Sequence, residues 1–269
     1  MDLDLKDHIV VVTGGGSGIG RASAATFAAE GANVAIWDLS DSATKAAEEI
    51  QQQFPVRVIG ISADVTDESV VLAATEQTIR VLGPINHLVH AAGIGSGKFG
   101  FPFTNLRPVD WLSVMQVNVM GMVHVAHAIA PRMVDRQSGT MVFVASVAGQ
   151  IGSQTDPPYS ASKAANINFA QCMAKDLAAK GVRANTVCPG MVQTPLNQSV
   201  WQAWYHQTPP AERLSYDDWA ERKIRAVVPL GRWQTPEAIA DMIVFLSSDR
   251  SAHVTGQTIN VDGGFVMHW

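Results

Sequence analysis

A tyrosine and a lysine stand four residues apart in the run Tyr159-Ser160-Ala161-Ser162-Lys163. On a helix this spacing places both side chains on one face, one turn apart. A free tyrosine has a pKa of ~10 and is a poor base at neutral pH. A neighbouring ammonium favours the phenolate, and a pKa lowered by ~2–3 would bring the phenol within range of proton transfer. The pair is therefore a candidate acid/base device, although the same spacing more often places a partly buried ring beside a solvated charge.

A glycine cluster joins an early apolar segment to an Ala-rich one, in the run Thr13-Gly14-Gly15-Gly16-Ser17-Gly18-Ile19-Gly20. Glycines permit a tight turn and close approach of a ligand, and a helix N-terminus offers free N–H groups to a pyrophosphate. An ordinary turn would look alike, but Asp38 ends the next apolar segment, where a ribose-binding carboxylate is expected. This carboxylate repels a 2′-phosphate, and neither Ser17 nor Leu39 supplies a basic partner for one. The pattern predicts NAD as cofactor rather than NADP.

Short apolar segments alternate with Ala-rich segments along the chain. Seven are expected to be strands, over 8–13, 33–37, 56–61, 86–90, 140–145, 183–188 and 257–261. Six have helical composition, over 18–30, 42–53, 68–82, 117–136, 159–180 and 236–247. The alternation predicts a Rossmann-like α/β fold, a doubly wound parallel sheet of about seven strands with helices on both faces. Because no linker is evident, we expect one dinucleotide-binding catalytic domain over 1–269, with ligands at the carboxyl ends of the strands.

The composition narrows the classes of function. The chain has 269 residues and a formal net charge of −5, which offers no basic surface for nucleic acid. The first ten residues resemble no targeting peptide, and no uninterrupted apolar run reaches the ~18 residues of a membrane span. Cys172 and Cys188 are too few for a disulfide framework, so we expect both to be reduced, buried and inert. These features predict a cytoplasmic protein that binds neither nucleic acid nor a membrane.

In combination, these motifs resemble those of the short-chain dehydrogenase/reductase family over essentially the whole chain. Thr13, Gly14, Gly18 and Gly20 match its TGxxxGxG cofactor loop. The further matches are Asp64-Val65, Ala92-Gly93, the asparagine Asn118, the serine Ser146, the YxxxK pair Tyr159 and Lys163, and Pro189-Gly190 with Thr194. One position departs from the family pattern. His90 stands where the family has the first asparagine of Asn-Asn-Ala-Gly, and we expect it to brace the sheet rather than to act as a base.

The resemblance implies a role for each matched position. The implied catalytic residues are Asn118, Ser146, Tyr159 and Lys163. The implied cofactor-binding residues are Gly14, Ser17, Gly18, Ile19, Gly20, Asp38, Asp64, Val65, His90, Ala92, Gly93, Tyr159, Lys163, Pro189, Gly190, Val192 and Thr194.

In the implied reaction, Tyr159 takes the hydroxyl proton of a secondary alcohol while hydride leaves the same carbon for the nicotinamide. Lys163 lowers the pKa of Tyr159 and holds the nicotinamide ribose. Ser146 orients the substrate oxygen, and Asn118 holds a water that passes the proton towards solvent. No metal is expected, because the histidines at 87, 90, 124 and 127 form no ligand set with cysteines or carboxylates. His124 and His127 are instead expected to pack in the core or at an interface.

The substrate is expected to be a small secondary alcohol or ketone, such as a polyol or a sugar. The stretch 196–228 fits the alternation poorly and stands where the family carries its substrate lid. Trp201, Trp204 and Tyr205 share one helical face there, which either packs on the protein or closes the pocket. The expected pocket walls are Ile94, Ser96, Ser146, Ala148, Ile151, Tyr159, Met191 and Trp201.

The chain ends in an apolar run, Phe265–Trp269, of the kind that is buried against a partner subunit. With the family resemblance, this predicts a homotetramer.

Two alternatives to an alcohol dehydrogenase stay open: an inactive NAD-binding sensor or scaffold, and a 3-oxoacyl-carrier-protein reductase. The complete catalytic set speaks against the first, and Asp38 against the second.

Overall fold

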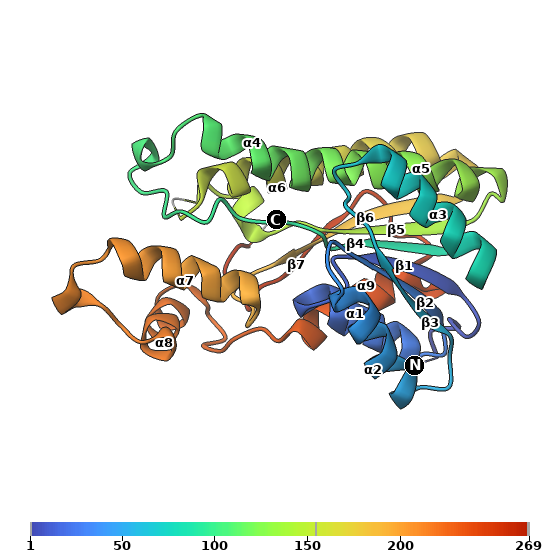
Figure 1. Ribbon diagram of the computed structural model, residues 1–269, viewed down its shortest axis with the longest axis horizontal. Coiled ribbons are helices and arrows are strands. Elements are labelled where there is room, and N and C mark those ends of the chain that lie inside the picture. Colours follow the sequence, from blue (N-terminus) through green and yellow to red (C-terminus); the bar gives the residue numbers. More distant parts are fainter. Residues whose placement is uncertain (1, 154, 268–269) are drawn as a thin grey trace.

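Seven parallel strands form the central sheet of the computed structural model, which describes residues 2–153 and 155–267 (Figure 1). The strands are β1 (Ile9–Thr13), β2 (Asn33–Asp38), β3 (Val58–Ser62), β4 (His87–His90), β5 (Gly139–Val144), β6 (Val182–Pro189) and β7 (Thr258–Val261). Their order across the sheet is β3-β2-β1-β4-β5-β6-β7. The strand order therefore reverses between β1 and β4, where sheets of this type open a crevice for a ligand. The predicted doubly wound, Rossmann-like fold is confirmed.

Helices cover both faces of the sheet (Figure 1). One face carries α1 (Gly18–Ala29), α2 (Ser42–Gln53) and α9 (Pro236–Ser247), and the other carries α3 (Glu68–Leu82), α5 (Gly121–Asp135) and α6 (Pro157–Leu177). In β1, Val10 and Val12 pack under the first group, while Ile9 and Val11 pack under the second. Successive side chains of a strand point to opposite faces, so a strand that is covered on both faces must be apolar throughout.

Capping residues and prolines determine where two helices of the site begin. Asp156 is the N-cap of α6 and Thr194 is the N-cap of α7 (Pro195–Gln207), and a proline follows each. The cap side chain accepts an N–H of the first turn, and proline loses no hydrogen bond there. The local sequence therefore places Tyr159 in the first turn of α6.

Each predicted strand lies within two residues of an observed one, but the helix predicted over 117–136 is different. α4 (Val109–Met115) continues through a π-helical turn, Gln116–Met120, into α5. A π-helical turn inserts one extra residue and often marks a functional site. Asn118 lies in this turn.

The continuous helix Val109–Asp135 is long and apolar enough to cross a membrane by length and composition alone. Met122, Val125 and Ile129 on this helix are fully buried against the sheet. The apolar side chains of its α5 part thus serve the protein's own core.

The predicted lid segment, 196–228, consists of α7, a short 3-10 turn at Pro210–Glu212 and α8 (Tyr216–Val227). Trp204 lies 6.3 Å from Trp219 of α8, measured between ring centroids. Trp201 lies 5.8 Å from Tyr216 and donates from Nε1 to the Leu214 carbonyl at 3.2 Å. The aromatic face of α7 therefore packs on α8 and its loop. Figure 1 shows the two helices projecting from one end of the sheet.

One expectation about individual side chains needs correction. Cys188 is buried, but Cys172 is exposed on α6, so the prediction that both cysteines are buried was wrong. At the chain end, Phe265 and Val266 pack against Ala145 and Cys188 of the same chain. Both are only half-buried and Met267 is exposed, so the burial of this tail against a partner subunit stays a prediction. His268 and Trp269 lie outside the described residues.

Two buried histidines couple the stability of the fold to pH. His87 Nδ1 lies 2.7 Å from Thr140 Oγ1, and its Nε2 lies 2.9 Å from His8 Nδ1. Burial lowers the pKa of His87 to about 3, with a smaller contribution from the charge of His8. Burial also lowers the pKa of His90 to about 3, with a smaller contribution from Lys163. Both imidazoles are therefore neutral in the folded protein.

We expect the free energy of unfolding to decrease as the pH falls below ~6.5, the pKa of histidine in an unfolded chain. Below that value the unfolded chain binds protons that the folded chain excludes. For each histidine, the free energy of unfolding then decreases by about 2 kcal/mol as the pH falls from 7 to 5. Urea unfolding at the two pH values measures the loss. His87→Asn should remove one histidine's share of it, and an unchanged pH dependence in that variant would contradict the assignment.

Candidate active site

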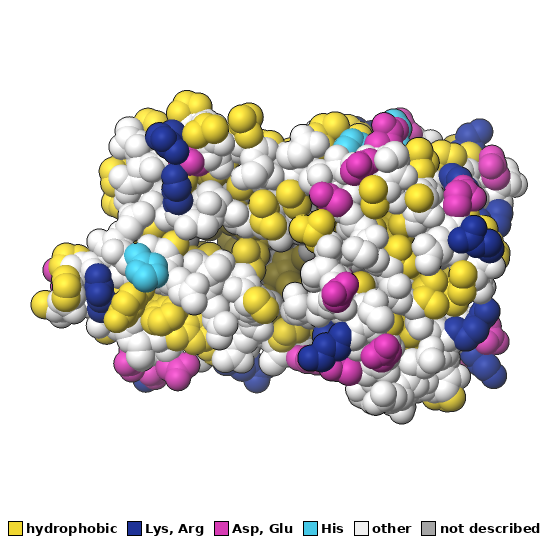
Figure 2. All heavy atoms as spheres, viewed as in Figure 1, with side chains coloured by type: hydrophobic (Ala, Val, Ile, Leu, Met, Phe, Trp, Pro, Cys, Tyr) yellow, Lys and Arg dark blue, Asp and Glu magenta, His cyan; other side chains and the backbone are white. Residues whose placement is uncertain are grey.

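The side chains predicted to do chemistry meet at the carboxyl edge of the sheet. Thr13 ends β1, Asp38 ends β2, and Ser146 follows β5. Figure 2 shows a hollow on this side of the molecule, between the lid helices and the sheet, with apolar side chains in its floor. The strand order thus brings together residues that are far apart in the sequence.

The glycine loop has the shape of a ligand cradle. A Cβ added to Gly20 would lie 2.2 Å from the Gly14 carbonyl oxygen, and a Cβ added to Gly14 would lie 2.7 Å from the Ala92 nitrogen. Gly14 and Gly18 have φ values of 65° and 52°, which favour glycine. Ser17 is the exposed N-cap of α1, and its side chain makes no capping hydrogen bond. The hydroxyl and the first N–H groups of α1 are therefore open to an anion.

Asp38 closes one side of this cradle. Its Oδ2 accepts the Gly16 N–H at 3.0 Å, and within the described part of the chain Oδ1 accepts no hydrogen bond. Leu39, the next residue, is 69% exposed. The arrangement leaves one carboxylate oxygen for the hydroxyls of a ribose. The glycine cradle, the free Ser17 hydroxyl and this oxygen together fit a dinucleotide.

Asp64 and Val65, implied to bind the cofactor, follow Ala63, whose N–H donates to the Asp38 carbonyl at 2.8 Å. Asp64 Oδ1 accepts hydrogen bonds from the N–H and the hydroxyl of Thr66, at 2.8 and 2.7 Å. Val65 is buried, and its carbonyl oxygen lies 2.9 Å from His124 Nδ1. His124 thus anchors the loop after β3. Among the described residues no group of three or more His, Cys, Asp or Glu could hold a metal ion.

Lys163 is a buried ammonium with a defined partner. Its Nζ donates to the Val144 carbonyl at 2.8 Å and lies 5.5 Å from the centroid of the Tyr159 ring. Burial lowers the pKa of Lys163 to about 8. A Cβ added to Gly93 would lie 3.2 Å from Nζ, so the loop after β4 passes directly over the ammonium. Tyr159, Lys163 and Gly93 therefore meet at one place.

The pKa of Tyr159 is not lowered as the sequence suggested. Burial raises it to about 12, a hydrogen bond with Ser146 acts in the opposite direction, and the charge of Asp156 raises it further. Lys163 points its ammonium at Val144 rather than at the phenol oxygen, which explains why burial prevails. In this structure the protein alone does not activate the phenol.

Ser146 and Asn118 approach Tyr159 from two other elements. Ser146 is buried, and its Oγ accepts the Ala148 N–H at 3.1 Å. A Cβ added to Gly149 would lie 2.7 Å from the Ala164 nitrogen, so glycine lets the turn after Ser146 rest on the backbone of α6. Asn118 donates from Nδ2 to the Ile94 carbonyl and to Ser162 Oγ, both at 2.9 Å. Its Oδ1 accepts the Ile94 N–H at 2.8 Å, so the side chain clamps the loop after β4.

His90 braces the first and fourth strands. Its Nδ1 lies 2.9 Å from Thr13 Oγ1, while its Nε2 is buried without a hydrogen-bond partner in the described structure. Ala92 packs against the core beside it and offers its backbone to the cradle. The histidine thus takes a bracing role but leaves one polar atom unsatisfied.

The segment after β6 forms the wall opposite the glycine loop. Gly190 donates to the Val261 carbonyl at 3.2 Å, and Val192 pairs with Gln234 in an isolated parallel bridge. A Cβ added to Gly18 would lie 3.4 Å from Thr194 Cγ2. The glycine loop and the start of α7 therefore face each other, and Pro189 ends β6 just before this segment.

The predicted pocket walls are brought together only in part. Ser146 and Tyr159 adjoin each other, and Ala148 and Met191 are half-buried in the adjoining loops. Ile151 lines a separate shallow depression with Gly149 and Ala164, and Trp201 is engaged by α8. A small cavity beside α7 has residues that sequence reasoning missed: Gly95, Gly97, Lys98, Thr155, Asp156, Ser199, Val200 and Ala203. The aspartate before two prolines in Asp156-Pro157-Pro158 is a capping signal that could have indicated Asp156.

Comparisons with known proteins agree with this geometry. The family model described as enoyl-(acyl carrier protein) reductase matches residues 14–266. The 3-oxoacyl-[acyl-carrier-protein] reductase FabG of Thermotoga maritima is 34% identical, and the match covers 98% of this chain and 99% of that protein. The 2-(S)-hydroxypropyl-CoM dehydrogenase 3 of Xanthobacter autotrophicus is 36% identical over 97% of both chains. The solved L-sorbose reductase of Gluconobacter frateurii, complexed with NADPH and L-sorbose, is 27% identical, with a TM-score of 0.90 over 100% of both chains.

Proposed function

This chain belongs to the short-chain dehydrogenase/reductase family, and we propose that it is an NAD-dependent oxidoreductase that interconverts a small secondary alcohol and its ketone. The observation that carries the proposal is the meeting of Tyr159, Lys163 and Ser146 beside a glycine cradle that fits a dinucleotide. A bound nicotinamide cofactor would supply the hydride acceptor or donor. Proton transfer and the positioning of the substrate belong to residues of the chain.

Tyr159 holds and moves the proton. In the oxidation direction its phenolate oxygen takes the hydroxyl proton of the substrate, and in reduction the phenol returns it to the ketone oxygen. Ser146, whose side chain opposes the rise in the pKa of Tyr159, fixes the substrate oxygen beside the phenol. The Lys163 ammonium, held by Val144, supplies the positive charge that favours the phenolate once the site is assembled.

Asn118 orients this machinery from the π-helical turn. Its side-chain amide is fully used in holding Ile94 and Ser162. Its main-chain carbonyl lies in the π-helical turn and accepts from Asn166 Nδ2 at 2.7 Å. We assign the proton path to that carbonyl.

A polyol or a sugar is the proposed substrate class. The likeness to the L-sorbose reductase supports a sugar, and the solved levodione reductase, 29% identical with a TM-score of 0.89, is a second reductase of this fold. A 3-oxoacyl-carrier-protein reductase is the second candidate, favoured by the FabG relatives. Turnover of a carrier-bound 3-oxoacyl chain, with none on free ketones, would select it. An inactive sensor is the third, and any turnover excludes it.

We further propose a cytoplasmic homo-oligomer, a tetramer. The two free cysteines fit a reducing compartment. Exposed apolar side chains gather on α4 and the loop before it, at Phe101, Phe103, Val109 and Leu112, and Figure 2 shows apolar atoms on that corner. Burial against a second copy would remove them from water. A solution mass near 28.8 kDa, that of one chain, would contradict the assembly.

Tyr159→Phe should lower kcat by at least ~100-fold, because it removes the proton-transferring hydroxyl and leaves the ring in place. Binding of NADH, followed by its fluorescence, should change less than about twofold, since no hydroxyl of the glycine cradle is lost. Tyr205→Phe on α7 is the matched control and should retain wild-type kcat. Full activity of Tyr159→Phe would refute the proposed role.

Asp38→Asn should shift the ratio of kcat/KM for NAD over NADP by about tenfold towards NADP, on the order of 1.4 kcal/mol. The amide retains an acceptor for the Gly16 N–H but no longer repels a 2′-phosphate. Asp41→Asn, an exposed residue three positions later, should leave the ratio unchanged. A wild-type enzyme that uses NADP better than NAD would overturn the argument from Asp38.

A further inference from the structure

Asp156 carries a buried carboxylate that the proposed mechanism does not use. Its side chain belongs to a residue that is 7% exposed, directly before Pro157 and Pro158 at the start of α6. No cation within the described chain forms an ion pair with it. A buried carboxylate is costly unless hydrogen bonds satisfy it, so its contacts indicate its purpose.

The carboxylate joins two segments of the site. Oδ2 accepts the Ser96 N–H at 2.7 Å, and Oδ1 faces the Tyr159 N–H at 3.5 Å. A Cβ added to Gly95 would lie 2.8 Å from Oδ2, so glycine allows the loop to come this close. One side chain thus contacts both the loop after β4 and the residue proposed to move the proton.

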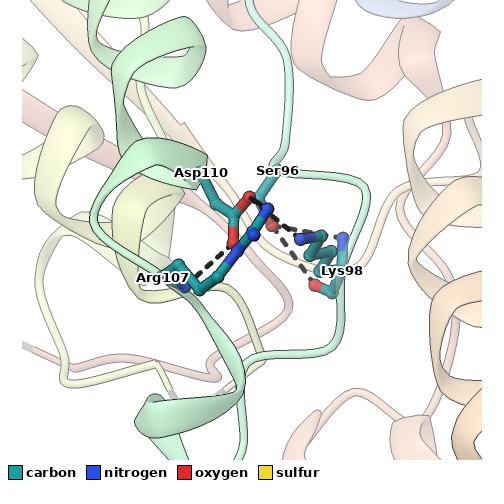
Figure 3. A network of polar contacts seen from close by, with 4 residues as sticks. All are labelled: Ser96, Lys98, Arg107 and Asp110. Atoms are coloured by element: carbon teal, nitrogen blue, oxygen red, sulfur yellow. Dashed lines mark hydrogen bonds and ion pairs between the residues drawn. The ribbon is translucent and has the colours of Figure 1, made fainter.

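The loop 94–98 is held at three points. Asn118 binds Ile94 at its start, and Asp156 binds Ser96 at its centre. Figure 3 shows the third point, where Lys98 Nζ donates to Asp110 Oδ1 of α4 at 2.9 Å while Ser96 Oγ bonds the backbone of Lys98. The loop and α4 are therefore fixed relative to the start of α6.

This loop is also a wall facing the lid. A Cβ added to Gly95 would lie 3.8 Å from Leu196 Cδ1 of α7, and the cavity beside Asp156 is closed by Ser199 and Ala203 of the same helix. Movement of the loop would therefore change the space between the loop and α7.

We propose that Asp156 is a positioning residue: its carboxylate fixes the loop 94–98 against the first turn of α6, and thereby sets where the substrate lies relative to Tyr159. The proposal rests on the proposed oxidoreductase function for its effect on turnover. Its effect on the loop stands apart from that function.

The charge of Asp156 provides a second readout. It contributes to the raised pKa of Tyr159, and burial raises the pKa of Asp156 itself. The other ionisable groups near the Asp156 carboxylate and the Tyr159 phenol are Lys163 of α6, Cys188 of β6 and Lys98 of the loop. Burial raises the pKa of Cys188 to about 12, so its thiol stays neutral at working pH. Replacing Asp156 by a neutral side chain should therefore ease the ionisation of Tyr159.

The first test follows amide hydrogen exchange of the Ser96 region in the full chain. In Asp156→Ala the exchange of this loop should become at least tenfold faster, because its central hydrogen bond is lost. Asp156→Asn, which keeps an acceptor oxygen, should exchange at nearly the wild-type rate. Asp67→Ala is the matched control, since Asp67 also caps a helix, α3, and should leave the loop unchanged. Wild-type exchange in Asp156→Ala would overturn the proposal.

The second test measures kcat, KM and their pH dependence. Asp156→Ala should raise KM at least tenfold and lower kcat less. Asp156→Asn should keep KM within about threefold and move the pH limb assigned to Tyr159 down by ~0.5 or more. Kinetics of both variants equal to those of Asp67→Ala would refute the positioning role. If the wild-type chain transfers no hydride at all, the proposed function fails, and the exchange test alone decides whether Asp156 positions the loop.

Discussion

The hydrogen bond from Lys163 Nζ to the Val144 carbonyl is the contact on which the site depends. A buried ammonium needs an acceptor, and the end of β5 supplies it. The bond holds α6 across the carboxyl edge of the sheet, which puts the Tyr159 ring 5.5 Å from the ammonium and the loop of Gly93 above it. Loss of this register would separate Tyr159 from the glycine cradle.

Close backbone approach is the second constraint, and it explains several glycines. Gly20 admits the Gly14 carbonyl, Gly149 admits the backbone of α6, and Gly95 admits the carboxylate of Asp156. In each case a side chain would occupy space that belongs to a neighbouring part of the site. Polar side chains then fix the loops so brought together: Asp38 holds the glycine loop, and Asn118 holds the loop after β4. The rigid sheet supplies the edge, and these contacts determine its chemistry.

The sequence was sufficient for the strands and for the residues of the edge, because buried parallel strands leave a strong apolar signal and the glycine and YxxxK spacings are local. It did not show α4, whose exposed Leu112 and Val109 break the expected apolar pattern. It also failed for properties that depend on three-dimensional surroundings. The pKa of Tyr159 reflects burial, Cys172 lies on the outer face of its helix, and the contact between Asp156 and Ser96 joins residues sixty positions apart.

We propose that Tyr159 acts as a base only when the cofactor is bound, since burial in the protein alone raises its pKa to about 12. Titration of tyrosinate absorbance, taken as wild type minus Tyr159→Phe with and without NAD, measures this directly. The positive nicotinamide ring and Lys163 should together bring the ionisation of Tyr159 into the range of pH ~7 to ~10 when NAD is present. Without NAD, no Tyr159 signal should appear in that range. The same difference spectrum in both states would contradict the central claim.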